Sequence, residues 1–255
     1  MALYDAYRSA LAQGRSVVLA TVIAGPDGIG SKLLVRPDGS IEGSPLPAEL
    51  ANQVVADALD HLRDEAAGTV SYQRPEGAFE VFFDVYPAPP QLVIVGAGHV
   101  AVPLARFGKE LGYRVVVTDA RAAFARPERF PEADQVLKGW PHDVLPALDL
   151  DESTYVVLLS HDLKFDEPTL DHVLPSAVRY IGAIGRRKTQ RSRFERLRLQ
   201  GYTENQLGRL FGPVGLDIGG RTPEETAIAI LAEITAVRRG RPGGFMRDRE
   251  RRQAP

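Results

Sequence analysis

An apolar run that leads directly into a glycine-rich turn is the feature that most constrains the fold of this chain. The segment reads Gln91-Leu-Val-Ile-Val-Gly-Ala-Gly-His99, and apolar residues at helical spacing follow it from Val100 onward. Gly96 permits a tight turn, and Gly98 lets the backbone approach a phosphate at the positive end of the helix. The pattern predicts a strand, turn and helix of the Rossmann nucleotide-binding type.

The rest of this region alternates between strand-like and helical patterns. Strand-like runs occupy residues 92–95, 114–118, 134–137, 154–159 and 178–184. Such alternation is typical of an α/β fold with a parallel, doubly wound sheet. We therefore expect a Rossmann-type domain over residues 91–240 and a charged tail over residues 241–255.

A proline-rich segment at 87–90 precedes this domain and predicts a linker, because proline has no amide hydrogen with which to continue a sheet. Upstream, short apolar runs at 17–23, 31–35 and 40–42 are separated by Asp-Gly turns and predict a small meander. Helical spacing from Pro47 to Glu65 predicts a helix ended by Gly68, and residues 79–86 predict a strand. Residues 1–86 therefore predict a smaller N-terminal α/β or α+β domain.

Composition narrows the classes of function. The 255 residues include no cysteine and carry a formal net charge of -2. The missing cysteine excludes disulfides, thiolate metal sites and a cysteine nucleophile, and the charge gives no broad basic surface for nucleic acid or anionic lipid. No apolar run approaches the roughly 18 residues of a membrane span, and no histidine spacing indicates a metal site. We expect a cytoplasmic protein with neither a nucleic-acid nor a membrane partner.

Asp119 closes the strand that follows the glycine turn. A carboxylate at this position could accept hydrogen bonds from ribose hydroxyls and would repel a 2′-phosphate, so a bound dinucleotide would be NAD rather than NADP. The alternative is that Gly96 and Gly98 only shape the turn and that the site holds something else.

Polar residues follow two later strands. Ser160, His161 and Asp162 come after the 154–159 strand, with His161 and Asp162 as candidate catalytic residues. Gly185, Arg186, Arg187 and Lys188 come after the 178–184 strand. Because ligands of doubly wound sheets bind beyond the carboxyl ends of the strands, we expect both sets to meet His99 and Val100 in one crevice.

The basic residues after 185 divide into two groups. Arg186, Arg187 and Lys188 are placed to contact phosphate oxygens, for which guanidinium groups are well suited. The others, Arg193, Arg196 and Arg198, are interpreted as a solvated helix face. Further on, Asp217 lies in a turn-rich segment that forms either a pocket wall or a connection, and Thr222-Pro-Glu-Glu225 predicts a capping box that starts the last helix.

Together these motifs resemble the XdhC/CoxI family of xanthine dehydrogenase accessory proteins. The resemblance rests on Val95-Gly-Ala-Gly-His-Val100, Ser160-His-Asp162, Tyr180-Ile-Gly-Ala-Ile-Gly-Arg-Arg-Lys188, Gly215-Leu-Asp-Ile-Gly219 and Thr222-Pro-Glu-Glu225. Residues 20–22, 30–35 and 38–39 look like a shortened version of the family's N-terminal domain. One departure stands out, because Gly43-Ser-Pro-Leu-Pro47 replaces the family's usual Gly-Gly-Cys segment.

The resemblance implies binding of the molybdenum cofactor (molybdopterin), protection of it while sulfido replaces an oxo ligand, and delivery to a molybdenum hydroxylase. It also implies a cysteine desulfurase as sulfur donor, and a homodimer. The residues leave two other functions open: an NAD(P)-binding oxidoreductase with His161 as proton carrier, or a nucleotide-sensing module. We expect a maturation factor rather than a stand-alone enzyme, because only 86 turn-rich residues remain to supply a substrate domain.

Overall fold

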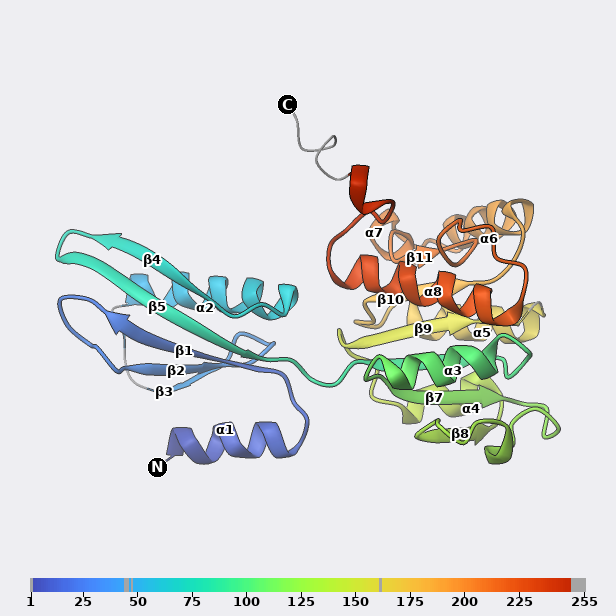
Figure 1. Ribbon diagram of the computed structural model, residues 1–255, viewed down its shortest axis with the longest axis horizontal. Coiled ribbons are helices and arrows are strands. Elements are labelled where there is room, and N and C mark those ends of the chain that lie inside the picture. The colour runs from blue at the N-terminus through green and yellow to red at the C-terminus, as the bar shows by residue number, and fades with distance from the viewer. Residues whose placement is uncertain (1, 44–45, 47, 161, 249–255) are drawn as a thin grey trace. The chain divides into compact units, whose positions relative to one another are not determined.

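The computed structural model describes residues 2–43, 46, 48–160 and 162–248 (Figure 1). The chain forms two compact units, Met1–Ala88 and Pro89–Pro255, and each unit has its own hydrophobic core. Within the described ranges, no helix is long and apolar enough to cross a membrane.

The N-terminal unit is an antiparallel sheet of five strands in the order β3-β2-β1-β5-β4. Successive side chains of a strand point to opposite faces, so Val18 of β1 packs with Val54 of α2 while Val17 packs with Ala10 of α1. The two helices therefore cover opposite faces of the sheet. The elements are α1 (Ala2–Ala12), β1 (Val17–Ala24), β2 (Lys32–Val35), β3 (Ile41–Gly43), α2 (Ala48–Asp64), β4 (Gly68–Arg74) and β5 (Gly77–Tyr86).

The end of helix α2 differs from the sequence expectation. The helix ends at Asp64, and Gly68 begins strand β4 instead of ending the helix. This strand lies at the edge of the sheet, and only Val70 and Tyr72 turn apolar side chains towards the core. Two apolar side chains in a strand of seven residues are too weak a pattern to be recognised from the sequence.

The C-terminal unit is a six-stranded parallel sheet in the order β11-β10-β9-β6-β7-β8. The strands are β6 (Gln91–Val95), β7 (Arg114–Asp119), β8 (Gln135–Lys138), β9 (Thr154–Leu158), β10 (Tyr180–Ala183) and β11 (Leu210–Phe211). The helices are α3 (Ala101–Glu110), α4 (Pro141–Val144), α5 (Leu163–Val173), α6 (Arg187–Leu199), α7 (Glu204–Leu207) and α8 (Pro223–Arg238), with 3-10 turns at Pro127–Arg129, Leu145–Ala147 and Met246–Asp248.

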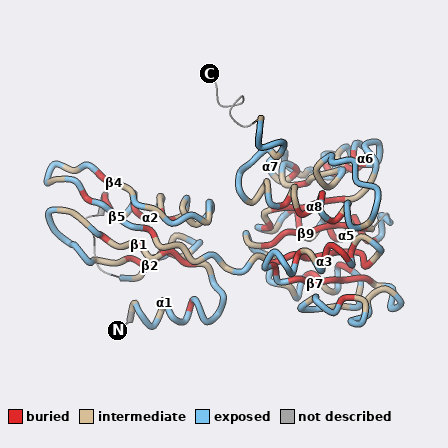
Figure 2. Tube along the Cα trace, viewed as in Figure 1, coloured by how far each residue is buried: buried red, intermediate tan, exposed pale blue. Residues whose placement is uncertain are grey.

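Both faces of this sheet are covered. Leu104 of α3 and Ile230 of α8 pack on one face with Leu92 and Ile94, whereas α5, α6 and α7 pack on the other face. Figure 2 shows the resulting buried residues along strands such as β7 and β9. The predicted α/β fold with a parallel, doubly wound sheet is confirmed. The last residues of the expected tail, 249–255, lie outside the described residues.

The order of the strands creates a switch point at the centre of the sheet. From β6 the chain moves to β7 and β8 on one side, and then crosses to β9, β10 and β11 on the other. The connections after β6 and β9 therefore leave opposite faces of neighbouring strands, which opens a crevice at their carboxyl ends. This is where the candidate site lies.

Candidate functional site

A cleft of about 900 Å³ lies at the carboxyl ends of the central strands. We call it the switch-point cleft. Its walls come from the segments that follow β6, β7, β9 and β10, which all end at the same edge of the parallel sheet. The lining residues are Gly98, His99, Val100, Arg121, Phe124, Leu159, Ser160, Asp162, Leu163, Lys164 and Ile184.

The glycine turn after β6 forms the floor of this cleft. Gly96 has a φ of +104°, and a Cβ there would lie 3.1 Å from the carbonyl carbon of Leu159 and from the nitrogen of Ser160. The turn after β6 thus packs directly on the backbone that follows β9. At Gly98 a Cβ would meet no atom within 4 Å, so the missing side chain leaves open space in the cleft.

Asp119 lies beneath the turn, and its side chain is fully buried. One carboxylate oxygen, Oδ2, accepts from the backbone N–H of Ala97 at 2.9 Å and from Nη2 of Arg121 at 2.7 Å. The other, Oδ1, accepts from the backbone N–H and from Nε of Arg121, both at 2.9 Å. Since four donors fill both oxygens, ribose hydroxyls could reach Asp119 only if Arg121 moved away.

These contacts set the pKa of Asp119. Burial alone raises the pKa, but hydrogen bonds from the Arg121 side chain, from its backbone N–H and from Ala97 N–H outweigh burial and hold the pKa below its ordinary value of 3.8. A carboxyl group whose pKa is depressed by folding adds stability that is present above its unfolded pKa and is lost as the pH falls through the folded value.

Acidification is therefore expected to weaken the C-terminal unit partly through Asp119. Between about pH 5 and about pH 2 the wild-type free energy of unfolding should fall more steeply than that of Asp119→Asn, whose amide does not titrate. Urea unfolding followed by the fluorescence of Trp140, the chain's one tryptophan, measures both curves. If the two proteins lost stability in parallel as the pH fell, Asp119 would not contribute to the acid sensitivity.

The cleft offers hydrogen-bond donors that suit an anion. Arg121 and Lys164 bring two positive charges, which are balanced by Asp162 in the lining and by the buried Asp119 that pairs with Arg121, so attraction depends on the remaining N–H donors and not on an excess of positive charge. Helix α3 has no acidic residue in its first turn and no side-chain cap at Val100, so none of the helix's own side chains competes with a ligand for its positive end, which opens into the cleft. The Arg121 guanidinium also lies 4.2 Å from the ring centre of Phe124.

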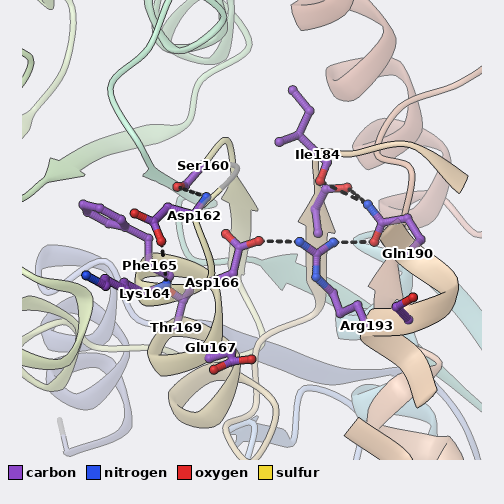
Figure 3. Close-up of polar contacts among 12 residues, drawn as sticks. Ser160, Asp162, Lys164, Phe165, Asp166, Glu167, Thr169, Ile184, Gln190 and Arg193 are labelled. Carbon is purple, nitrogen blue, oxygen red and sulfur yellow. Dashed lines mark hydrogen bonds and ion pairs between the residues drawn. The ribbon is translucent and has the colours of Figure 1, made fainter. Parts of the chain in front are cut away.

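The segment after β9 is organised around the start of helix α5 (Figure 3). Ser160 Oγ accepts from the backbone N–H of Asp162 at 3.0 Å, and Asp162 Oδ1 accepts from the backbone N–H of Lys164 at 3.0 Å, which caps the helix. His161, the other candidate catalytic residue, lies outside the described residues. His99 is exposed and lines the cleft as expected.

Two smaller clefts adjoin the first. A second cleft of about 450 Å³ is lined by Gly185 and Arg186 and shares Ile184 with the switch-point cleft. A third of about 390 Å³ is lined by Arg187 and shares Pro213 with the second. Most of the predicted crevice is thus a row of three clefts; Lys188 is exposed but lines none of them.

The interpretation of Arg193 as part of a solvated helix face is wrong. Arg193 forms a buried ion pair with Asp166 of α5, and each side chain is 3% exposed (Figure 3). It also donates to Gln190 Oε1, whose amide nitrogen donates to the backbone oxygens of Ala183 at 3.0 Å and Ile184 at 3.1 Å. This chain of contacts ties α5 to the end of β10.

The physical reason lies in the composition of helix α6. Its inward face consists of Gln190, Arg193 and Leu197, so a helix with few apolar residues must bury polar ones and supply them with partners. In contrast, the side chains of Arg196 and Arg198 are 40% and 52% exposed, as a solvated face requires.

The loop between β11 and α8 contains Asp217, which is exposed and lines none of the three clefts. The capping box at its end is confirmed. Thr222 Oγ1 accepts from the backbone N–H of Glu225 at 3.2 Å, and Glu225 Oε2 accepts from the backbone N–H of Thr222 at 3.0 Å.

The lining residues that the sequence reasoning missed include Arg121, Phe124 and Lys164. Arg121 lies only two residues beyond strand β7, and Lys164 lies in the first turn of the helix that follows β9. Inspection of the residues directly after each strand end would have found Arg121. Phe124 and Lys164 lie further beyond the ends of β7 and β9, and no sequence signal marks them.

Comparison with known sequences gives matches along most of the chain. A family model described as the XdhC Rossmann domain matches residues 92–234, and one described as the XdhC and CoxI family matches residues 10–73. The uncharacterised protein YqeB of Escherichia coli (strain K12) is 30% identical over 228 residues, which cover 85% of this chain and 42% of YqeB.

Two further relatives have descriptive names. A probable xanthine dehydrogenase subunit of Bacillus subtilis (strain 168) is 33% identical over 150 residues, covering 59% of this chain and 43% of the relative. The molybdenum cofactor insertion chaperone PaoD of Escherichia coli (strain K12) is 31% identical over 99 residues, covering 38% and 31%. The chain thus spans less than half the length of these curated relatives.

A crystal structure of a xanthine dehydrogenase from Bacillus halodurans has a similar fold. It superposes with a TM-score of 0.54 and 20% sequence identity, and the match covers 98% of this chain and 97% of the other. The Rossmann model alone covers more than half of the 255 residues. The resemblance seen in the sequence motifs is therefore confirmed, and the chain belongs to the XdhC and CoxI family.

Proposed function

We propose that this protein is an accessory protein that holds the molybdenum cofactor in the switch-point cleft and passes it to a molybdenum hydroxylase of the xanthine dehydrogenase type. The names of two relatives, a molybdenum cofactor insertion chaperone and a probable xanthine dehydrogenase subunit, support this role. The observation that carries it is the cleft itself, in which Arg121, Lys164 and the open end of helix α3 converge.

The described residues fit a phosphorylated pterin. Its phosphate would interact with Arg121, Lys164 and the backbone N–H groups at the start of α3, because such helix ends and cations are the usual protein ligands of phosphate. Phe124 lines the same wall, with the Arg121 guanidinium over its ring, and adds apolar surface beside which the flat pterin could lie. A volume of about 900 Å³ is ample for a cofactor of this size.

Cofactor holding, rather than sulfur chemistry, is the role that we assign to this chain. None of its residues is a cysteine, so sulfur cannot be carried here as a persulfide. Three residues of the segment that replaces the family's Gly-Gly-Cys motif, 44, 45 and 47, lie outside the described residues. We assign the sulfur donation to a separate cysteine desulfurase and propose that the protein acts as a homodimer.

Substitution of Lys164 tests the site. The purified protein is mixed with molybdenum cofactor under anaerobic conditions and gel-filtered, and the retained pterin is quantified. Lys164→Met should weaken retention about tenfold, since a charged hydrogen bond to phosphate contributes roughly 1.5–3 kcal/mol. Lys109→Met is the matched control, because Lys109 is a lysine in the last turn of α3, at the opposite end of the helix from the cleft.

The control should retain as much pterin as the wild-type protein. Absence of retained pterin from the wild-type protein would refute the proposed function. Equal loss in the two variants would show that net charge, and not the cleft, holds the cofactor.

A further inference from the structure

In many Rossmann domains the residue at the end of the second parallel strand, here β7, decides which ligand binds. A carboxylate there accepts hydrogen bonds from the ribose hydroxyls of a dinucleotide. In this protein Asp119 occupies that position, but its side chain is buried and both its oxygens are filled by Ala97 and Arg121. The groups that would recognise ribose are engaged within the protein.

Arg121 presents the opposite chemistry to the cleft. A guanidinium has five N–H donors, and Asp119 takes two of those on Arg121, at Nε and Nη2. The other three have no acceptor within the described residues. The side chain is 53% exposed and lines the cleft, while the ring of Phe124 at 4.2 Å and that of Phe165 at 5.9 Å restrict its plane.

We infer that Arg121, oriented by Asp119, makes the switch-point cleft selective for a phosphate monoester over a ribose diol. This inference rests on the proposed function and names the group of the ligand that the cleft recognises. Paired oxygens of a phosphate match the free edge of a guanidinium that is already held in place. Lys164 and the end of α3 supply further positive charge within the same cleft.

A dinucleotide with a free 2′-hydroxyl lacks the group that Arg121 needs. Its ribose would meet a charged guanidinium in place of the carboxylate that normally accepts its hydroxyls. A ribose that carries a 2′-phosphate and a phosphorylated pterin both offer a phosphate monoester. The cleft would recognise the same phosphate monoester in either ligand, and an experiment is needed to tell which of the two ligands binds.

Calorimetric titration with inorganic phosphate, NADH and NADPH tests the inference on the full chain. The wild-type protein should bind phosphate and should not bind NADH. In Arg121→Ala, phosphate affinity should fall tenfold or more, and NADH binding should become measurable because each oxygen of Asp119 loses its guanidinium donor and keeps only one backbone N–H. Arg121→Lys keeps the charge but cannot make the forked contacts, so its phosphate affinity should lie between the two.

Thermal unfolding shows whether each variant is folded, and Arg121→Lys preserves the test if the alanine variant is not. The inference would be overturned if the wild-type protein bound NADH as tightly as Arg121→Ala does. It would also be overturned if Arg121→Ala bound phosphate as tightly as the wild-type protein does. Binding of NADPH but not NADH, if it depends on Arg121, supports the inference and identifies a ribose 2′-phosphate as the recognised group. Binding of phosphate without either dinucleotide supports the inference and indicates a different phosphate monoester.

The two proposals fail separately. If the protein retains no molybdenum cofactor but binds phosphate through Arg121, the proposed function is wrong and the selectivity stands. If wild-type and Arg121→Ala proteins retain the cofactor equally, the selectivity is wrong and the proposed function stands.

Discussion

Replacement of Arg193 with methionine is expected to lower the free energy of unfolding of the C-terminal unit by about 3–5 kcal/mol. The substitution keeps much of the side-chain volume but leaves the carboxylate of Asp166 buried without its cation. It also removes the donor to Gln190 Oε1. Loss of one partner of a buried ion pair is far more costly than loss of an exposed ion pair.

The measurement is urea unfolding followed by tryptophan fluorescence, because Trp140 belongs to this unit and is the chain's one tryptophan. Arg196→Met is the control, as Arg196 lies on the same helix, faces Glu167 of α5 at 3.4 Å and is 40% exposed. Its effect should stay below about 1 kcal/mol.

A double variant separates the charge from the packing. Arg193→Met combined with Asp166→Leu removes both charges, and apolar pairs of similar volume often replace buried ion pairs with little loss of stability. Most of the lost free energy should therefore return, apart from about 1 kcal/mol for the partner lost by Gln190. The prediction is wrong if the single variant is as stable as the wild-type protein. It is also wrong if the double variant is no more stable than the single variant, because the loss would then not come from the buried charge of Asp166.

Alanine is expected to destabilise the protein at Gly96 but to leave its stability nearly unchanged at Gly98. Gly96→Ala should destabilise the C-terminal unit by about 1–3 kcal/mol, because the backbone has a φ of +104° and the new Cβ would press on the backbone of Leu159 and Ser160. Gly98→Ala should change the free energy of unfolding by no more than about 0.5 kcal/mol, since a Cβ there meets no atom within 4 Å.

Retention of the ligand should depend on Gly98, although the stability of the protein should not. Its added methyl group enters the cleft at the end of α3, so retained molybdenum cofactor should fall about tenfold, the equivalent of 1.4 kcal/mol, although the protein remains stable. Unfolding curves and gel-filtered pterin, measured on the same preparations, separate the two effects. A Gly98→Ala protein that retains the cofactor normally would show that the ligand does not approach this turn.

Much of the C-terminal fold could be predicted because several local signals agree. The apolar run before Gly96, the alternation of strand-like and helical patterns and the capping box at Thr222 all indicate a doubly wound sheet. The meander of the N-terminal unit was marked by its Asp-Gly turns. Strand β4 was missed because it lies at a sheet edge with few apolar side chains.

The site could be predicted only in part, because residues after strand ends are visible in a sequence but their pairings are not. His99, Ser160 and Asp162 line one cleft because parallel strands end at a common edge. The burial of Arg193 depends on Asp166, 27 residues away, and the occupation of Asp119 depends on the conformation of Arg121. Such contacts are set by tertiary packing rather than by local pattern.

Ile184 forms part of the wall of the first two clefts, and Pro213 forms part of the wall of the second and third. A ligand that shifts Ile184 from one side therefore alters the neighbouring cleft on the other side. If such a shift couples the two clefts, thermodynamic linkage requires that occupancy of the second cleft changes affinity in the first by the same factor as the reverse. Under the proposed function, a partner that bound in the second cleft and moved Ile184 would thereby change the affinity of the first cleft for the cofactor.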